Sequence, residues 1–274
     1  MDQLPPTFIN VDRLLVRHDC VSSGMRTIPE ETPIALTYGH STYAVMMGTP
    51  ADVEDFAIGF SLTERIIENV AEISALEVVT LPQGIEARMS LLSNRDEQLV
   101  SRRRRIMGPG GCGLCGIESL DAAVVPPAPV ASPMHISTET IFRSVKSLRD
   151  VQTLNERTHA AHAAGFWSND RLVAVREDVG RHNALDKLAG ALARMKVDGA
   201  SGILILSSRL SIELVQKAAA IGCPVIVAVS APTAFALRAA ELCGMTAIAV
   251  ARDDSLEVFT HAHRIEMASA HVAG

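Results

Sequence analysis

Three short apolar runs in the second half of the chain indicate the fold class: ILIL at 203–206, VIVAV at 225–229 and TAIAV at 246–250. A helix-like pattern that closes on a glycine fills each gap between them, at 211–221 and at 232–243. Apolar strands that alternate with helices are typical of βαβ units, in which helices cover both faces of a parallel sheet. The sequence therefore predicts an α/β fold with a largely parallel sheet over its C-terminal part.

The residues that follow these strands are predicted to share one edge of the sheet, because parallel strands bring their carboxyl ends together. They include Ser208 and Arg209 after the first run, Ser230 and Thr233 after the second, and Arg252 after the third. Hydroxyl side chains and free N–H groups at a helix N-terminus suit a phosphate, and an arginine can bind one through two parallel hydrogen bonds. The alternative is that the serines and threonines only cap helices. Three such loops on one edge favour a ligand site.

The composition restricts the class of protein. The chain has 274 residues, 48% of them apolar and only 4% aromatic, which predicts one or two domains with an aliphatic core. The net charge of −6 argues against a general nucleic-acid binder. No apolar run reaches the roughly 18 residues that a spanning helix needs, and we find no signal peptide. Five cysteines, an odd number, fit reduced thiols, so we expect a cytoplasmic protein with neither membrane nor nucleic-acid partners.

The first part of the chain predicts a smaller α+β domain over residues 1–125. Strands are expected at 33–38, 41–47, 75–81 and 85–92, and one helix is expected from an N-cap at Thr49 to about Asn69. The proline-rich stretch 126–133 is the predicted joint to a second domain, 126–274. That domain should open with a helix at 137–150 and a hairpin at 160–167 and 171–176. Two histidines near its first strand, His159 and His162, are expected to be hydrogen-bonded within the core.

The sharpest chemical signal is the segment GPGGCGLCG at 108–116, which places Cys112 and Cys115 in a C-x-x-C spacing. So many glycines predict a mobile loop. Four consecutive arginines at 102–105 precede it. Nearby cations favour the thiolate, which is the nucleophilic form of cysteine. The segment therefore predicts two reactive thiols.

Three functions fit this pair of cysteines. A structural zinc site needs four ligands, and Cys20, Cys223 and Cys243 stand in isolation, so no metal site is expected. A thioredoxin-type redox pair normally begins a helix after a strand, whereas helix-compatible sequence starts here only near Ile117. A carrier thiol, which accepts a group such as sulfane sulfur and passes it on, suits a flexible loop. Cys223 and Cys243 are most simply core residues.

The stretch from Asp178 to Lys187 also allows two interpretations. In the first, Asp178 caps the helix that follows, and Asp186 and Lys187 lie on its solvated face. In the second, Arg181, His182 and Lys187 face an anion at the edge of the sheet. The residues alone leave both open.

Several segments together make the chain resemble the FdhD family, the sulfur carrier proteins required for formate dehydrogenase activity. They are Glu31-Thr32-Pro33, Cys112-Gly113-Leu114-Cys115-Gly116, Thr158 with His162, REDVGRHNALDK at 176–187, Ser208 to Glu213, Val229 to Thr233, and Arg252 with Phe259-Thr260. The resemblance covers residues 30 to 265, and the runs at 176–187 and 230–233 are highly specific.

The resemblance implies a function. Members of this family accept sulfur from a cysteine desulfurase as a cysteine persulfide. They pass it to the molybdenum cofactor, a bis(molybdopterin guanine dinucleotide), before the cofactor enters formate dehydrogenase. The family's persulfide cysteine corresponds to Cys112, with Cys115 as the second thiol. Its cofactor-binding segment corresponds to Val250, Ala251, Arg252, Asp253, Asp254 and Ser255, and a GDP-like nucleotide is a possible mimic of the cofactor.

The resemblance also implies a homodimer and a cytidine-deaminase-like α/β/α domain in the C-terminal part. Deamination is not expected, because neither the H-x-E nor the P-C-x-x-C zinc signature is present. The chain departs from the family at Gly108-Pro109-Gly110-Gly111, where hydroxyl residues are commoner. The alternative function is a cofactor-binding chaperone whose C-x-x-C is only a redox pair.

Overall fold

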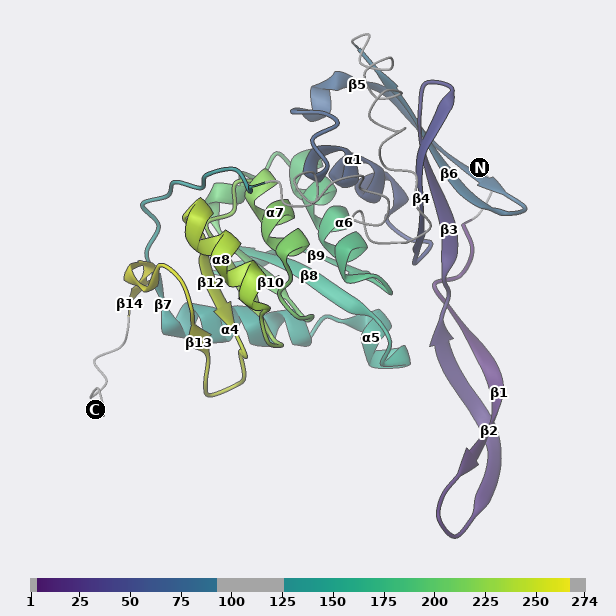
Figure 1. Ribbon diagram of the computed structural model, residues 1–274. Coiled ribbons are helices and arrows are strands. Elements are labelled where there is room, and N and C mark those ends of the chain that lie inside the picture. The colour runs from purple at the N-terminus through teal and green to yellow at the C-terminus, as the bar shows by residue number, and fades with distance from the viewer. Residues whose placement is uncertain (1–3, 93–125, 267–274) are drawn as a thin grey trace.

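The computed structural model describes residues 4–92 and 126–266. The segment 108–116 with Cys112 and Cys115, and the arginines at 102–105, lie outside these residues. The predicted domain boundary at 125 falls where the second described part begins, and it stays a prediction. The two described parts pack directly against each other (Figure 1).

The larger part of the molecule is built around a six-stranded sheet with the strand order β13-β12-β11-β10-β8-β9. Its strands are β8 (His162–Ser168), β9 (Arg171–Asp178), β10 (Ile203–Leu206), β11 (Val225–Ala228), β12 (Thr246–Ala249) and β13 (Glu257–Val258). The three apolar runs form β10, β11 and β12, which pair in parallel as predicted. The outer strands β8, β9 and β13 pair antiparallel, so the prediction of a largely parallel sheet is wrong and the sheet is mixed.

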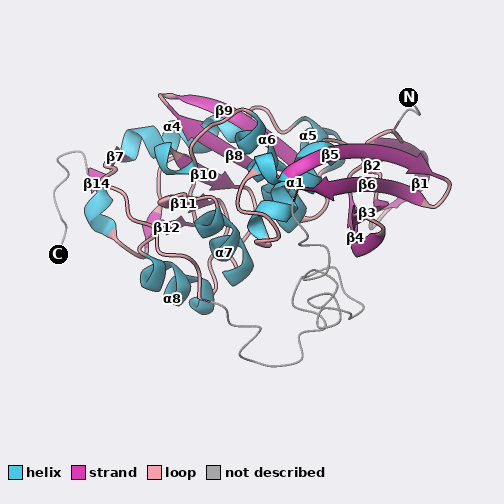
Figure 2. Ribbon diagram, turned by 90° about the horizontal axis from the view of Figure 1, so that it is seen from above, coloured by secondary structure: helices cyan, strands magenta, loops and turns pink. Residues whose placement is uncertain are grey.

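Helices cover both faces of this sheet (Figure 2). On one face lie α6 (Arg181–Arg194), α7 (Ile212–Ala220) and α8 (Ala234–Cys243), which bury Leu204 and Leu206 of β10. On the other face lies α4 (Thr138–Arg149), which packs with Ile203 and Ile205 of the same strand. Because both faces are buried, β10 is apolar throughout and shows no polar alternation. The layers are therefore α/β/α.

The smaller part has a four-stranded sheet with the order β4-β3-β6-β5, covered by α1 (Val53–Thr63). The strands are β3 (Thr32–Tyr38), β4 (Ser41–Gly48), β5 (Ile73–Leu81) and β6 (Gly84–Leu91), close to the predicted ranges. Phe56 of α1 is fully buried against Ile34 and Ile85 of the sheet. The α+β prediction for this part is confirmed.

The helix predicted from Thr49 to Asn69 is shorter than expected. Its start is delayed because Asp52 has a φ of 52°, in the left-handed region, so α1 begins at Val53. Thr49 does not cap it: the Thr49 N–H donates to Asp178, and its hydroxyl accepts from the Val179 N–H. At the other end, Arg65 has a φ of 54° and ends the helical path.

Two glycines allow α1 and α6 to touch along their backbones (Figure 1). A Cβ on Gly59 would lie 1.7 Å from the carbonyl oxygen of Asp186, and a Cβ on Gly190 would lie 1.9 Å from that of Asp55. Any larger residue must therefore push the helices apart. This contact holds the two parts of the molecule together.

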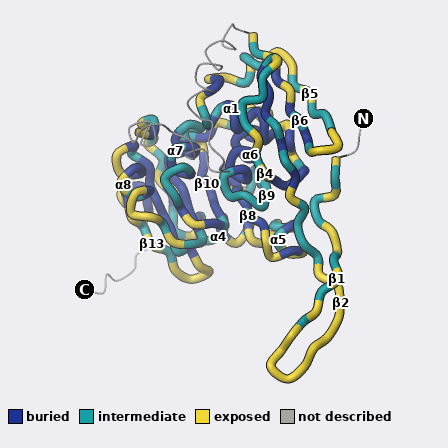
Figure 3. The backbone as a smooth tube through the Cα atoms, turned by 45° about the vertical axis from the view of Figure 1, so that its right-hand side comes forward, coloured by how far each residue is buried: buried dark blue, intermediate teal, exposed yellow. Residues whose placement is uncertain are grey.

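A long hairpin extends from the body of the molecule, formed by β1 (Phe8–Val16) and β2 (Val21–Pro29) (Figure 3). Its outer half is exposed, and α5 (Thr153–Thr158) contacts its base, where Arg157 stacks over the Phe8 ring at 4.9 Å. The sequence pattern does not predict this hairpin, because polar residues interrupt both strands. The short strands β7 (Ile136–Ser137) and β14 (Ile265–Glu266) pair with each other, and 3-10 turns occur at Val70–Glu72, Gly199–Ser201 and Ala262–Arg264.

None of the helices in residues 4–92 and 126–266 combines the length and the apolar character that crossing a membrane requires.

Candidate functional site

The loops that follow β10, β11 and β12 lie side by side, as the parallel spacing predicts. Backbone hydrogen bonds link them in a row: the Ser230 N–H donates to the Ser208 carbonyl at 3.4 Å, and the Val250 N–H donates to the Ser230 carbonyl at 3.3 Å. Ser208 is buried, and its hydroxyl donates to the Arg209 carbonyl, while the Arg209 side chain is exposed. Their role as ligand-binding residues stays a prediction.

The capping alternative holds for one of these residues. The Thr233 hydroxyl accepts from the Ala236 N–H at 3.2 Å and is therefore the N-cap of α8. Ser211, the N-cap residue of α7, makes no such bond, and its hydroxyl oxygen is buried. Thr233 thus has a structural role that accounts for its presence without a ligand.

The loop at 250–255 is shaped by an unusual backbone. Val250 has a φ of 52°, in the left-handed region. This conformation is rare for a β-branched residue, and residues strained in this way concentrate at functional sites. Beyond buried Ala251, the exposed Arg252 turns back: its guanidinium donates to the carbonyl of Val229, and to that of Ala251 at 3.1 Å. Its backbone N–H donates to the Ser255 carbonyl at 2.8 Å. The turn therefore places a cation at the carboxyl end of β11.

The next two acidic residues of that loop, Asp253 and Asp254, are exposed. Asp253 forms an ion pair with Arg149 of α4, with 2.6 Å between nitrogen and oxygen. This ion pair connects the predicted binding loop at 250–255 to α4, the helix on the other face of the sheet from α6, α7 and α8. Asp254 accepts a hydrogen bond from the Ser255 hydroxyl at 3.2 Å.

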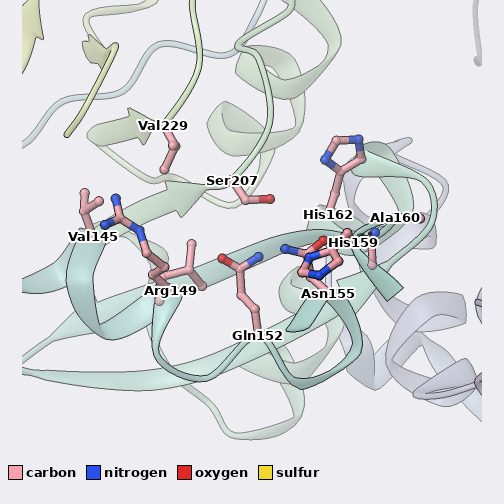
Figure 4. Close-up of a pocket in the computed structure, with 11 residues that line it drawn as sticks. Val145, Arg149, Gln152, Asn155, His159, Ala160, His162, Ser207 and Val229 are labelled. Atoms are coloured by element: carbon pink, nitrogen blue, oxygen red, sulfur yellow. Dashed lines mark hydrogen bonds between the residues drawn. The ribbon is translucent and has the colours of Figure 1, made fainter. Parts of the chain in front are cut away.

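Beside Arg149 a cavity of about 510 Å³ opens at the ends of β10 and β11 (Figure 4). Its lining comes from α4, the following turn, α5, the start of β8 and the two strand ends: Val145, Leu148, Arg149, Gln152, Asn155, His159, Ala160, Ala161, His162, Ser207 and Val229. None of the predicted cofactor-binding residues lines it. Strand order predicts a site at this edge of the sheet, but the sequence analysis did not identify the cavity, which opens on the side of α4 and α5.

The two histidines of the cavity correct a prediction. His159 is exposed and His162 is half-buried, and neither ring forms a hydrogen bond with another described residue, so they are not satisfied core histidines. Burial lowers the pKa of His162 from its ordinary value of 6.5, and the charge of Arg181 lowers it further. The His162 ring is therefore neutral near pH 7 and can donate or accept a hydrogen bond.

A second polar cluster lies where α6 and α7 begin, and it contains the predicted residue His182. Within the described part of the chain, four buried atoms there have no hydrogen-bond partner: Arg181 Nε, His182 Nε2, Ser211 Oγ and Glu213 Oε2. His182 Nε2 lies 3.9 Å from the Glu213 carboxylate, too far for a direct bond. Burial lowers the pKa of His182 to about 4, with a smaller effect from Arg181. The histidine is therefore neutral near pH 7.

His182→Gln should change how stability depends on pH. The unfolded state takes up a proton near pH 6.5 and the folded state only near pH 4, so this group lowers stability as the pH falls through that window. Denaturant unfolding at several pH values should show a steeper acid loss for the wild type than for the variant. His162 is present in both proteins, so parallel curves would contradict a buried neutral His182.

The stretch 178–187 is part of the junction between the two parts of the molecule. Lys187 and Asp178 are fully buried and 2.7 Å apart. The Lys187 ammonium also donates to the Thr49 carbonyl at 2.9 Å. The expectations of a solvated Lys187 and of a Lys187 that faces an anion are therefore both wrong, because Thr49 from the distant smaller part closes over it. Gly180, not Asp178, is the N-cap of α6.

Asp186 is buried as well, and its partner is Lys217 of α7 at 2.9 Å. Its carboxylate also accepts from the Thr63 hydroxyl at 2.6 Å. Burial disfavours the charged form of Lys217, but Asp186 and Glu64 outweigh it and raise the pKa of Lys217. Asp186 was expected on a solvated face, but it is buried and forms an ion pair with Lys217.

Of the five cysteines, Cys20 is exposed and the other four form two groups. Cys223 is fully buried at the start of β11, and burial raises the pKa of its thiol to about 12. Cys243 is buried at the end of α8, and burial raises its pKa as well. Both are core residues, as predicted, and poor nucleophiles near neutral pH. Cys112 and Cys115 lie outside the described residues, so their role remains a prediction.

Comparison with known proteins agrees with the resemblance. The sequence model of the FdhD/NarQ family matches residues 29–266. The sulfur carrier protein FdhD of Agrobacterium fabrum is 49% identical over 261 residues, which are 94% of this chain and 96% of that protein. The protein of the same name from Brucella abortus is 47% identical over 258 residues, 93% of this chain and 96% of that one.

Solved structures include one with the same fold. It is a crystal structure from Desulfotalea psychrophila of a protein proposed to be a formate dehydrogenase accessory protein. The two chains are 24% identical and superpose with a TM-score of 0.75, over 95% of this chain and 100% of that one. The match to residues 29–266 and the relatives near half identity lead to one conclusion: this chain belongs to the FdhD/NarQ family.

Proposed function

We propose that this protein is a sulfur carrier. It accepts sulfur from a cysteine desulfurase as a persulfide on Cys112 and transfers it to the bis(molybdopterin guanine dinucleotide) form of the molybdenum cofactor, which then enters formate dehydrogenase. The observation that carries the proposal is the family match, which spans residues 29–266 and therefore includes both Cys112 and Cys115. The name of the relatives, sulfur carrier protein FdhD, supports the same activity.

In the loading step, the Cys112 thiolate attacks the outer sulfur of the desulfurase persulfide. The S–S bond of the donor breaks, the donor cysteine leaves as a thiolate, and Cys112 becomes the persulfide. No external oxidant is needed, because the sulfane sulfur is transferred at its own oxidation level. The arginines at 102–105 precede Cys112 by seven to ten residues in the sequence, and nearby cations favour the thiolate that this step requires.

In the release step, Cys115 supplies the electrons. Its thiolate attacks the inner sulfur of the Cys112 persulfide, a Cys112–Cys115 disulfide forms, and sulfide leaves to become a ligand of the molybdenum. A dithiol reductant then restores both thiols. The C-x-x-C spacing supports this step, because it keeps the second thiol close to the first.

The substrate's guanine nucleotide arms are proposed to bind at the sheet edge, with Ser208, Arg209, Ser230 and the loop 250–255. The backbone hydrogen bonds that link Ser208, Ser230 and Val250 support a single binding surface there. A homodimer, a cytoplasmic location and a cytidine-deaminase-like C-terminal domain are further parts of the proposal, and the α/β/α layers are compatible with the last of these.

A two-stage transfer assay tests the proposal. The protein is first loaded with radiolabelled sulfur from a cysteine desulfurase and cysteine, and is then mixed with the unsulfurated cofactor. A carrier should gain label in the first stage and lose it in the second. A chaperone whose thiols form only a redox pair would gain no label in the first stage, which would refute the proposal.

Arg252→Ala should weaken the binding of GDP, used as a mimic of the nucleotide arm. Loss of a charge-assisted hydrogen bond costs about 1.5–3 kcal/mol, or roughly ten- to hundredfold in affinity. The fold should be unaffected, because the Arg252 side chain is exposed and, among the described residues, its hydrogen bonds go to backbone carbonyls. Titration calorimetry measures the affinity, with Arg238→Ala on α8 as the matched exposed control. Equal GDP affinity of Arg252→Ala and wild type would remove Arg252 from the site.

A further inference from the structure

We propose that the outer face of α8 is the docking surface for residues 117–125 of this same chain, the stretch that joins the C-x-x-C segment to the second described part. The face consists of Phe235, Arg238 and Leu242, whose spacing of three and four residues places them on one side of the helix. Leu242 is 81% exposed, and no large apolar side chain in residues 4–92 and 126–266 is more exposed. An exposed apolar face bordered by a charge is typical of an interaction site.

The sequence before Pro126 has a matching pattern. Ile117, Leu120 and Val124 recur with the same spacing of three and four residues, which predicts the apolar side of a short amphipathic helix. Gly116 is an acceptable N-cap, and helices usually end before a proline such as Pro126. A helix of nine residues is marginal by itself in water, so it needs an apolar surface to pack against.

The start of the second described part determines which end of α8 this segment meets. The Val130 N–H donates to the Cys243 carbonyl at 2.7 Å, so the chain passes the C-terminal end of α8 soon after Pro126. The four residues from Pro126 to Val130 span at most about 14 Å, which keeps residue 125 near that end of the helix.

The lengths of the two helices also agree. A nine-residue helix is about 14 Å long, and α8 is about 15 Å long. With residue 125 at the C-terminal end of α8, the two helices run parallel. Ile117 then lies beside Phe235, and Val124 lies beside Leu242.

The charges support the same arrangement. The Arg238 guanidinium stacks over the Phe235 ring, 5.5 Å from its centroid, and forms no ion pair with another described residue. Glu241, the one carboxylate of α8, lies 3.8 Å from His261 instead. Asp121 borders the apolar side of the proposed helix and comes level with Arg238 when the helices run parallel. An ion pair between Arg238 and Asp121 would therefore fix the register.

Docking has a consequence that rests on the proposed function. α8 begins directly after the loop at 229–233, at the carboxyl end of β11. Cys115 precedes Ile117 by two residues, so a docked segment brings both thiols to the edge of the sheet where the substrate is proposed to bind. The α8 face thus positions the carrier thiols for sulfur transfer.

Hydrogen exchange of the full-length protein, read by mass spectrometry on peptides that cover 117–125, tests the docking. The wild type should show protected amides there. Leu242→Asp should make them exchange about ten- to hundredfold faster, because it places a charge where an apolar contact is proposed. The matched control is Leu14→Asp on the hairpin, at a leucine that is 71% exposed, and it should leave exchange at 117–125 unchanged.

A charge exchange tests the register. Arg238→Asp should speed exchange at 117–125, because it sets two carboxylates against each other. Adding Asp121→Arg should restore the protection, because the pair forms again with its charges reversed. A double variant without recovery would refute the proposed register.

Unprotected amides at 117–125 in the wild type would overturn the inference, and so would protection that Leu242→Asp leaves intact. Protection that is lost on dilution, together with a dimer in native mass spectrometry, would show that a second copy covers α8 and would also refute it. Sulfur loading is measured separately. A wild type that loads sulfur without this protection refutes only the docking, whereas one that loads no sulfur refutes the proposed function.

Discussion

Lys187→Met should lower the free energy of unfolding by about 3–5 kcal/mol, because it leaves the buried Asp178 carboxylate without its cation. Both side chains are fully buried, and their charged atoms are 2.7 Å apart. The lysine also donates to the Thr49 carbonyl, so the substitution weakens the junction between the two parts of the molecule. Denaturant unfolding measures the change.

Lys146→Met is the matched control for this substitution. Lys146 is exposed on α4, and its replacement should change stability by no more than about 0.5 kcal/mol. Adding Asp178→Asn to Lys187→Met should recover part of the lost stability, because an asparagine carries no buried charge. A Lys187→Met protein as stable as the Lys146→Met protein would show that the buried ion pair does not hold the junction.

Cys112→Ala should abolish sulfur loading, since it removes the proposed nucleophile and no remaining cysteine is equivalent. Cys223→Ala should load like the wild type, because Cys223 is fully buried and burial raises the pKa of its thiol to about 12. Protein-bound sulfane sulfur is measured after incubation with a desulfurase and cysteine. Cys223→Ala is destabilised by the lost core volume, so loading is compared at a temperature where circular dichroism shows both variants folded.

Equal loading of Cys112→Ala and wild type would exclude Cys112 as the acceptor. Loading that disappears only in a Cys115→Ala protein would move the acceptor role to the second thiol and reverse the two steps proposed above.

The parallel core of the fold could be predicted from the sequence because its signals are local. Residues 203–206, 225–229 and 246–250 are apolar runs, and the helices between them end at Gly222 and Gly244, both with positive φ. The hairpin of β8 and β9 was also predicted, from the turn at 168–170. Hydrophobic pattern and turn residues are enough to identify such elements.

The burial of Asp186 and Lys187 could not be predicted, because it depends on partners distant in sequence. Thr49 and Thr63 come from the smaller part, and Lys217 comes from the next helix. From the helix alone, two adjacent charges indicate a solvated face. The close contact of α1 and α6, which requires glycine on both helices, and the packing of α7 against α6 together turn that face inward.

The cavity was missed for a similar reason. Its polar residues come from α4, α5, β8 and the end of β10, and no two of these elements form a recognisable motif together. The edge of the sheet could be predicted from strand order, but the side on which the cavity opens depends on where α4 and α5 pack. His159 and His162 carry a signal, because two histidines stand near the start of a strand, but that pattern favours a core role over a cavity.

Mass spectrometry of the loaded wild-type protein tests the central claim most directly. The protein is incubated with a cysteine desulfurase and cysteine and then digested with trypsin, which cuts after Arg105 and after Arg143 and so yields one peptide with both Cys112 and Cys115. The account predicts that this peptide gains the mass of one sulfur atom and that fragmentation places the gain on Cys112. A peptide of unchanged mass, or a gain found only at exposed Cys20, would contradict it.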